Sequence, residues 1–178
     1  MFLCALRALA VHWGRTLAKP KYPMTPAVRF LREKKIAFKE YFYRYQEHGG
    51  TGVGAAELGY PEHRLIKTLV MQTDTKAVIL VLMHGDREVS TRNLARSLGV
   101  KSVEPCDEKT AGRHTGYAFG GTSPFGTRSF LPIYVEKTIF DLPRILINGG
   151  KRGFLVEIEP PVLREILPVH EVEVALSK

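Results

Sequence analysis

Residues 65–84 read LIKTLVMQTDTKAVILVLMH and carry the strongest strand signal in the chain. Two runs within it, 65–72 and 77–84, are rich in β-branched and aliphatic residues, and the polar turn TDTK at 73–76 joins them. Runs of this kind on either side of a short polar turn are typical of paired strands. The sequence therefore predicts an antiparallel hairpin at this point.

Helices are predicted on both sides of the hairpin from their capping residues. Thr25 followed by Pro26 forms an N-cap and first-turn pair, and Ser90 and Asp107 have side chains that can cap two later helices. Glycines that follow the apolar positions indicate where these helices stop. The predicted helices run from about Pro26 to Lys34, around Ala55 to Leu58, from Ser90 to Gly99, from Asp107 to near Gly116, and from Pro160 to Ile166.

Further strands are predicted at 38–45, 100–104, 133–136, 144–148 and 154–159. Strands and helices are mixed without a strict βαβ alternation. We therefore expect a single α+β domain around a mixed, largely antiparallel, barrel-like sheet with flanking helices.

The glycine-rich stretch at 49–54 formally resembles a dinucleotide fingerprint through Gly50, Gly52 and Ala55. The helix that such a fingerprint should open is broken at Gly59 and Pro61, within two turns. We expect a flexible loop beside a cleft here and no nicotinamide site.

The 178-residue chain carries 26 Lys and Arg against 18 Asp and Glu, a net charge of +8 that suits a polyanionic partner without naming one. Half of the surplus lies in residues 1–23, which have four basic residues and no acidic one. We expect 1–23 to be an N-terminal extension, either sequence upstream of a true start at Met24 or an Arg-bearing leader. Residues 24–178 are expected to form the working domain.

Only two cysteines are present, Cys4 and Cys106, so neither a disulfide framework nor a four-thiolate zinc site can form. A reducing, cytoplasmic location is expected. No apolar run reaches the length of a membrane span. We expect no metal, no cofactor, and neither membrane nor DNA as a partner.

Two partial matches to nucleotide and nucleophile motifs fail. Gly150 and Lys151 resemble the end of a phosphate loop, but Arg152 stands where a Ser or Thr must bind magnesium, and the first glycine of the loop is missing. Ser123 lies among glycines, but Phe125 occupies the last glycine position of a hydrolase elbow. Triphosphate hydrolysis and a serine-hydrolase elbow are therefore excluded.

Lys67 stands in the hairpin, where strand alternation places it on the face of Leu65 and Leu69. Such a lysine either reaches solvent at a sheet edge or projects into a polar pocket, and taken alone the residue favours the edge. Two dense turns accompany it, at 117–126 and 148–153. Turns this rich in glycine leave backbone N–H groups open to an anion or a developing oxyanion.

Four segments carry a family resemblance: 24–28 (MTPAV), Lys67-Thr68, 115–126 (TGYAFGGTSPFG) and 149–153 (GGKRG). Together they resemble the YbaK/EbsC aminoacyl-tRNA deacylases, free-standing relatives of the editing domain inserted in bacterial prolyl-tRNA synthetase. The resemblance runs from Met24 to about Ile166 and keeps the motifs in family order. It implies the fold of that family and hydrolysis of the ester that joins a wrong amino acid to tRNA, with cysteine on proline tRNA as the expected substrate.

The resemblance also implies which residues form the site. The catalytic group is Lys67 together with the loop that holds the amino acid and terminal adenosine, namely Gly120, Gly121, Thr122, Ser123 and Pro124. The substrate-binding group is Tyr43, Thr68, Tyr117, Asn148, Gly149, Gly150, Lys151 and Arg152. The implied partners are the tRNA acceptor end and prolyl-tRNA synthetase.

Two departures from the family bear on the amino acid removed. The segment between Tyr43 and Lys67 is shorter than in the best-known cysteine-specific members, and Leu155 stands where those members carry an acid. Two alternatives stay open: a deacylase for another small amino acid such as alanine, or a non-catalytic module that binds tRNA or a synthetase. Because an aminoacyl ester is already activated, positioning the carbonyl and stabilising the oxyanion would suffice for hydrolysis.

Overall fold

The computed structural model describes residues 22–177, and residues 1–21 of the expected extension lie outside that range. Its centre is the predicted hairpin: β2 (Leu65–Thr73) and β3 (Val78–His84) pair antiparallel, from Ile66 opposite His84 to Gln72 opposite Val78. Every residue of β3 is buried. The hairpin prediction is confirmed.

The hairpin forms the middle of an eight-stranded mixed sheet in the order β1-β8-β7-β2-β3-β6-β9, with β5 also paired to β2. The pairs β2–β7, β3–β6 and β6–β9 are parallel, and the other pairs of this sheet are antiparallel. The α+β prediction is confirmed, and within residues 22–177 the hydrogen-bonded path is open between β1 and β9. The remaining bounds are β1 Lys39–Phe42, β5 Val103–Pro105, β6 Ile133–Glu136, β7 Ile145–Lys151, β8 Phe154–Ile158 and β9 Val169–Val172.

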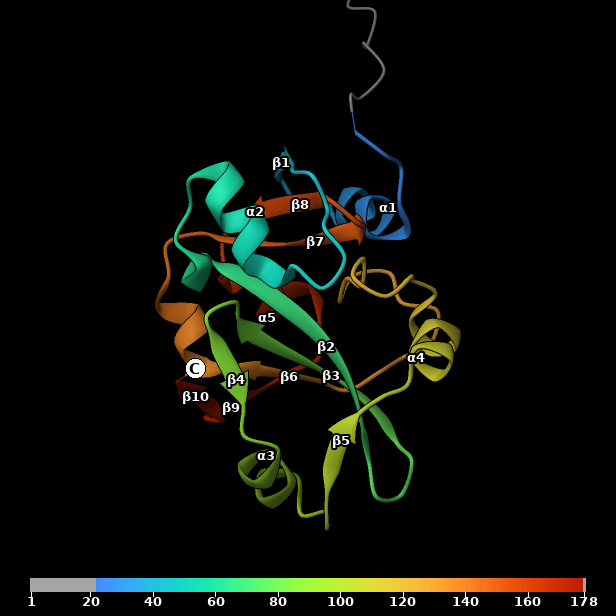
Figure 1. Ribbon diagram of the computed structural model, residues 1–178. Helices are drawn as coiled ribbons and strands as arrows, with labels where there is room; N and C mark the ends of the chain where they lie inside the picture. The colour runs from blue at the N-terminus through green and yellow to red at the C-terminus, as the bar shows by residue number, and fades with distance from the viewer. Residues whose placement is uncertain (1–21, 178) are drawn as a thin grey trace, which may run out of the picture.

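Five helices flank the sheet in the described range: α1 (Pro26–Glu33), α2 (Gly50–Leu58), α3 (Thr91–Leu98), α4 (Glu108–Thr115) and α5 (Pro161–Ile166). The three predicted side-chain caps are confirmed, since the side chains of Thr25, Ser90 and Asp107 each accept a hydrogen bond from the backbone N–H three residues on. In Figure 1, α2 lies in front of β7 and β2, while α1 and α4 lie on the right-hand side. None of these helices is long and apolar enough to cross a membrane.

The prediction of a flexible loop at 49–54 is wrong, because α2 begins at Gly50 and continues to Leu58. A Cβ on Gly54 would lie 3.4 Å from side-chain atoms of Leu65 and Tyr43, so the small residue lets the helix approach β2 closely. Packing of this kind overrides the poor intrinsic helix propensity of glycine. Five further elements were not predicted: the strands β4 (Arg87–Val89), β9 and β10 (Ala175–Ser177), and the 3-10 turns at Glu62–Arg64 and Lys137–Asp141.

The two faces of the central sheet are buried differently. One face, represented by Ile66 and Leu80, packs in the largest core cluster together with residues of α1 and α5. The other face divides into a cluster that contains Met71 and α3 residues and a smaller one that contains Leu65 beneath α2. By strand alternation Lys67 lies on this second face, between the two smaller clusters.

Tyr22 belongs to the packed domain. Its ring is 5.4 Å from that of Phe38 and 6.4 Å from that of Phe154, and Arg32 Nη2 donates to its hydroxyl at 2.8 Å. Packed structure thus extends two residues before Met24, the expected boundary of the domain.

Glu136 anchors the last described strand. Its carboxylate is 3% exposed, and Oε2 accepts hydrogen bonds from the backbone N–H groups of Val174 at 2.7 Å and Ala175 at 2.9 Å. β10 begins at Ala175 and pairs with β4. A single buried carboxylate therefore fixes the entry of β10 into its two-stranded sheet.

We expect Glu136→Gln to lower the free energy of unfolding by about 1–3 kcal/mol, because a neutral amide replaces a charged acceptor of two N–H groups, one of them buried. Urea unfolding measures the change. Glu173→Gln is the matched control, since that carboxylate is exposed and its partner is the exposed Lys137; its effect should be clearly smaller. Equal effects of the two substitutions would contradict the anchoring role.

His84 is fully buried at the end of β3. Its Nδ1 donates to the His63 carbonyl at 2.7 Å, its Nε2 is 2.9 Å from Thr138 Oγ1, and its ring stacks on that of His63 with centroids 3.7 Å apart. Burial lowers the pKa of the imidazole from its ordinary value, because a charged ring is poorly solvated there.

The lowered pKa of His84 predicts acid sensitivity. The unfolded chain binds this proton more readily than the folded one, so the stability present above pH ~6.5 should fall as the pH drops below that value. Urea unfolding at pH 7.5 and 5.5 measures the loss, and His84→Asn should reduce it. An unchanged pH dependence in His84→Asn would show that other groups cause the loss.

Candidate active site

The sheet has a notch beside the middle of β2. On this side β7 pairs with β2 only at Leu65–Leu146 and Ile66–Ile147, and β5 pairs with it only from Met71 onward. Lys67 and Asn148 are the first residues beyond the last β2–β7 pair. Since paired strands are about 4.8 Å apart, the backbones of these two residues leave the pairing side by side.

Lys67 is half-buried on an interior strand of the sheet. Its Nζ donates to the backbone carbonyl of Arg87, at the start of β4. The alternative in which the side chain reaches solvent at an edge strand therefore does not describe it, because the strand is interior and the ammonium group binds a backbone carbonyl. The ammonium group is held on the face that also carries Leu65.

Asn148 joins the two glycine-rich turns. Its Nδ2 donates to the Gly120 carbonyl at 3.2 Å, while its Oδ1 accepts from the backbone N–H groups of Gly150 at 2.8 Å and Lys151 at 3.2 Å. One amide side chain thus fixes its own turn and ties it to the 117–126 loop. The two glycine-rich turns singled out in the sequence are therefore in direct contact.

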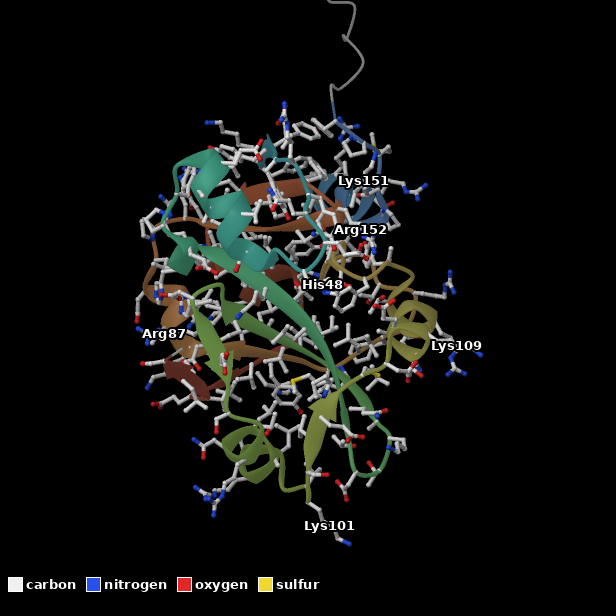
Figure 2. The ribbon with its side chains drawn as sticks, in the orientation of Figure 1. His48, Arg87, Lys101, Lys109, Lys151 and Arg152 are labelled. Carbon is white, nitrogen blue, oxygen red and sulfur yellow. The ribbon has the colours of Figure 1, made fainter. Side chains whose placement is uncertain are left out.

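A second connection between the turns passes through Arg152. Its Nε donates to the Phe119 carbonyl at 2.8 Å, and its guanidinium lies over the ring of Tyr45, 5.1 Å from the centroid. Tyr45 in turn covers Gly120. The chain between β1 and α2 therefore packs against both glycine-rich turns through Tyr45. We call this part of the molecule, formed by Tyr45 and residues 117–126 and 148–153, the corner. Figure 2 shows Lys151 and Arg152 on the side that also carries His48.

Glycine is required at 120 and 150 by space as well as by backbone conformation. Gly120 has φ +77°, and a Cβ there would lie 2.6 Å from the Tyr45 hydroxyl oxygen. Gly150 has φ +91°, and its Cβ would lie 2.8 Å from Tyr117 Cε1. Both positions combine a backbone that side-chain-bearing residues rarely adopt with a neighbour at less than contact distance.

Several predicted site residues lie beneath the loops and support them. Tyr117 is 6% exposed, and its hydroxyl donates to the Phe125 carbonyl at 2.5 Å. Burial raises the pKa of this phenol. Ser123 is fully buried, with its Oγ accepting from Phe125 N–H, and Gly149 accepts a hydrogen bond from Thr25 Oγ1 through its carbonyl. Tyr117, Ser123 and Gly149 are thus placed to hold the loops together; contact with substrate stays a prediction, as it does for the buried Pro124.

The backbone N–H groups of the loop differ in availability. Gly121 is buried and its N–H donates to the Ala118 carbonyl at 2.9 Å, so it is already used within the loop. Ser123 is buried as well. Thr122 is the partly exposed residue between them. Its backbone N–H is therefore the better candidate to donate a hydrogen bond to the carbonyl oxygen of the substrate.

Thr68 and Tyr43 lie on opposite sides of β2. Thr68 is on the face of Ile66, and its Oγ1 is buried without a hydrogen-bond partner among the described residues. Tyr43 packs in the cluster of Leu65, on the side of Lys67, and its N–H donates to the Gly153 carbonyl at 3.0 Å. Burial raises the pKa of the Tyr43 phenol, which therefore stays neutral at ordinary pH.

Two further residues lie beside these loops without a distinguishing signal in the sequence, Tyr45 and Phe119. Tyr45 belongs to the aromatic run predicted as a strand, where alternation gives no reason to separate it from its neighbours. Phe119 lies inside the quoted 115–126 motif, but no local pattern indicates its 55% exposure.

The model of the aminoacyl-tRNA editing domain matches residues 51–166. The chain belongs to the aminoacyl-tRNA editing domain family. A curated relative in Enterococcus faecalis, provisionally named Cys-tRNA(Pro)/Cys-tRNA(Cys) deacylase EbsC, is 31% identical over 140 residues, which cover 78% of this chain and 85% of that protein. The resemblance inferred from the motifs is confirmed.

Relatives of this editing domain also occur within larger enzymes. The proline–tRNA ligase of Brachyspira hyodysenteriae is 30% identical over 86 residues, which cover 48% of this chain but only 15% of the ligase. Among solved structures, one described as a candidate trans-editing enzyme for prolyl tRNA synthetase superposes with a TM-score of 0.75 at 19% identity, covering 87% of this chain and 100% of that one. A second, a hypothetical protein called APE2540, has a TM-score of 0.77 at 19% identity and covers 85% of this chain and 99% of that one. Both likenesses confirm the editing-domain fold.

Gly120→Ala tests whether the corner depends on close packing. We expect it to lower deacylation of aminoacyl-tRNA at least tenfold, because the new Cβ displaces Tyr45 or the loop. Gly59→Ala is the matched control: Gly59 also has positive φ, +69°, but a Cβ there meets no atom within 4 Å. The control should share the backbone strain, about 1 kcal/mol, and keep activity. Equal activity of the two variants would contradict the packing argument.

Proposed function

We propose that this protein hydrolyses the ester bond of mischarged aminoacyl-tRNA, and that cysteine on proline tRNA is its principal substrate. The observation that carries the proposal is the position of Lys67 beside Asn148 at the end of the β2–β7 pairing, with the Asn148 side chain bonded to both glycine-rich loops, in an editing-domain fold. The name of the Enterococcus faecalis relative supports the choice of amino acid and tRNA.

The residues at the notch suit an ester that is already activated. Lys67 supplies a positive charge fixed by the Arg87 carbonyl, and the Thr122 N–H is a candidate donor to the developing oxyanion. Preorganised donors of this kind stabilise a transition state without reorganising during the reaction. The neutral Tyr43 hydroxyl adds a further group that can donate a hydrogen bond to the substrate.

A cysteinyl ester brings its own nucleophile. Its thiol can attack the ester carbonyl, so that a C–S bond forms, the C–O bond breaks, and the tRNA hydroxyl leaves with the thiol proton. Water then opens the resulting thiolactone and releases free cysteine. On this route the protein has only to orient the ester and stabilise negative charge, which is the chemistry that the notch offers.

One observation favours a second candidate, removal of a small apolar amino acid such as alanine. Leu155 is 6% exposed and packs in the same cluster as Tyr43 and Leu65. Cysteine-specific relatives are expected to carry an acid at this position. The aliphatic Leu155 instead makes the surface formed with Tyr43 and Leu65 apolar. A methyl side chain would meet no unpaired charge there.

The tRNA acceptor end is the partner that follows from the reaction, and we propose prolyl-tRNA synthetase as a second partner. The similarity to segments of proline–tRNA ligases supports this, because in those proteins the related segment is part of the ligase chain. A free-standing copy would act on the same tRNA after its release.

Lys67→Ala tests the reaction directly. We expect wild-type protein to deacylate Cys-tRNA(Pro), to act more slowly on Ala-tRNA(Pro) and to spare Pro-tRNA(Pro), and we expect Lys67→Ala to lose about a hundredfold or more in rate because the fixed charge is removed. Release of labelled amino acid measures each rate. Lys76→Ala is the matched control, an exposed lysine of the same hairpin that pairs with Glu104.

Undiminished turnover by Lys67→Ala would overturn the role of that residue. Faster removal of alanine than of cysteine would favour the second candidate. Binding of tRNA with no hydrolysis of any of the three substrates by wild-type protein would instead support the non-catalytic module.

A further inference from the structure

Phe119 is an exposed aromatic residue directly next to the loop expected to hold the terminal adenosine. Its side chain is 55% exposed, although most large apolar residues of the described chain are buried. Its carbonyl accepts a hydrogen bond from Arg152 Nε at 2.8 Å, and the following residue, Gly120, is bound through its carbonyl by Asn148. The backbone that carries this ring is therefore fixed at two successive peptide groups.

Arg152 is oriented by two contacts that leave most of its donors for a ligand. The guanidinium lies over the Tyr45 ring and uses Nε for the Phe119 carbonyl. A guanidinium has five N–H donors in a planar fork that matches a phosphate, and Nε supplies only one of them. Arg152 and the adjacent Lys151 are both exposed.

The surface around Phe119 has the charge that an RNA backbone requires. The two glycine-rich segments 117–126 and 148–153 carry the cations Lys151 and Arg152 and no acid, and Arg152 contacts the Phe119 carbonyl directly. Figure 2 shows the labelled Lys151, Arg152 and His48 on one side of the molecule, around these segments. Phosphate groups are attracted to such a surface in a salt-dependent way.

We propose that Phe119 stacks on the base of the nucleotide that precedes the terminal adenosine, and that Arg152 binds the phosphate joining these two nucleotides. The inference rests on the proposed function. Single-stranded RNA ends are recognised by aromatic side chains that stack on unpaired bases, together with cations along the backbone. Phe119 directly precedes the loop expected to hold the terminal adenosine, and its ring is exposed to solvent. The ring is therefore available to the unpaired base next to that adenosine.

The stacking subsite predicts a difference between two substrates. Cysteine esterified to adenosine alone lacks the preceding nucleotide, whereas Cys-tRNA(Pro) carries it. We expect Phe119→Ala to lower kcat/KM for Cys-tRNA(Pro) about tenfold more than kcat/KM for cysteinyl-adenosine, within the range that loss of one base–aromatic stack produces. Phe119→Trp should restore the ratio of the two values, because indole also stacks.

Phe130→Ala is the matched control. Phe130 is 83% exposed in the same connection between α4 and β6, but it follows Arg128 and Ser129, whose N–H groups bind α4 carbonyls rather than the site. Its replacement should leave the ratio of the two kcat/KM values unchanged. Equal loss from Phe119→Ala and Phe130→Ala would overturn the proposal in favour of a general apolar contact.

A modified tRNA gives an independent test. Cys-tRNA(Pro) with an abasic ribose in place of the penultimate nucleotide should lower kcat/KM of wild-type protein about tenfold, and Phe119→Ala should then lose little more. Fully additive losses would overturn the stack. An effect of Phe119→Ala that appears only when prolyl-tRNA synthetase is added would overturn it too and assign Phe119 to a protein contact. If wild-type protein hydrolyses neither substrate, the proposed function fails, which is distinct from a failure of the stack alone.

Discussion

The short parallel pairing between β2 and β7 is the constraint on which the site depends. Two residue pairs hold the strands together, and the pairing ends where Asn148 turns toward the 117–126 loop. A longer ladder would have covered the flank of Lys67 with main chain. A shorter one would have separated the lysine from the glycine-rich turns. The notch is thus produced where the pairing of two strands ends, and Asn148 fixes the glycine-rich loops beside it.

Around this notch, rigidity comes from hydrogen bonds between side chains and backbone carbonyls. Asn148, Arg152, Thr25 and Lys67 each donate to a carbonyl of a segment distant in sequence. A backbone carbonyl is present whatever side chain the residue carries. These hydrogen bonds therefore do not depend on the side chains of the accepting residues. This arrangement fits a site that must hold an ester in place and needs few reacting groups of its own.

Local signals in the sequence predicted much of the fold. The caps at Thr25, Ser90 and Asp107 act through bonds within three residues, and the central hairpin needs only a four-residue turn. The start of α2 at Gly50 could not be predicted, because close approach to Leu65 and Tyr43 decides it. For the site, the motifs selected two loops that the structure brings into contact, but burial of Tyr117 and Ser123 and the exposure of Phe119 follow from tertiary packing that no local pattern records.

Thr25 and Gly149 are joined by a hydrogen bond across 124 residues of sequence, and Asn148 reaches Gly120 across 28. Contacts of such separation are expected to form late during folding. Closing the intervening chain costs conformational entropy, which only the completed contacts offset. No contiguous fragment of the chain contains the strand lysine, both loops and the Tyr45 segment without most of the domain. Catalytic activity would therefore appear only when most of the domain has folded. Local unfolding around Asn148 should abolish activity while the rest of the domain remains folded.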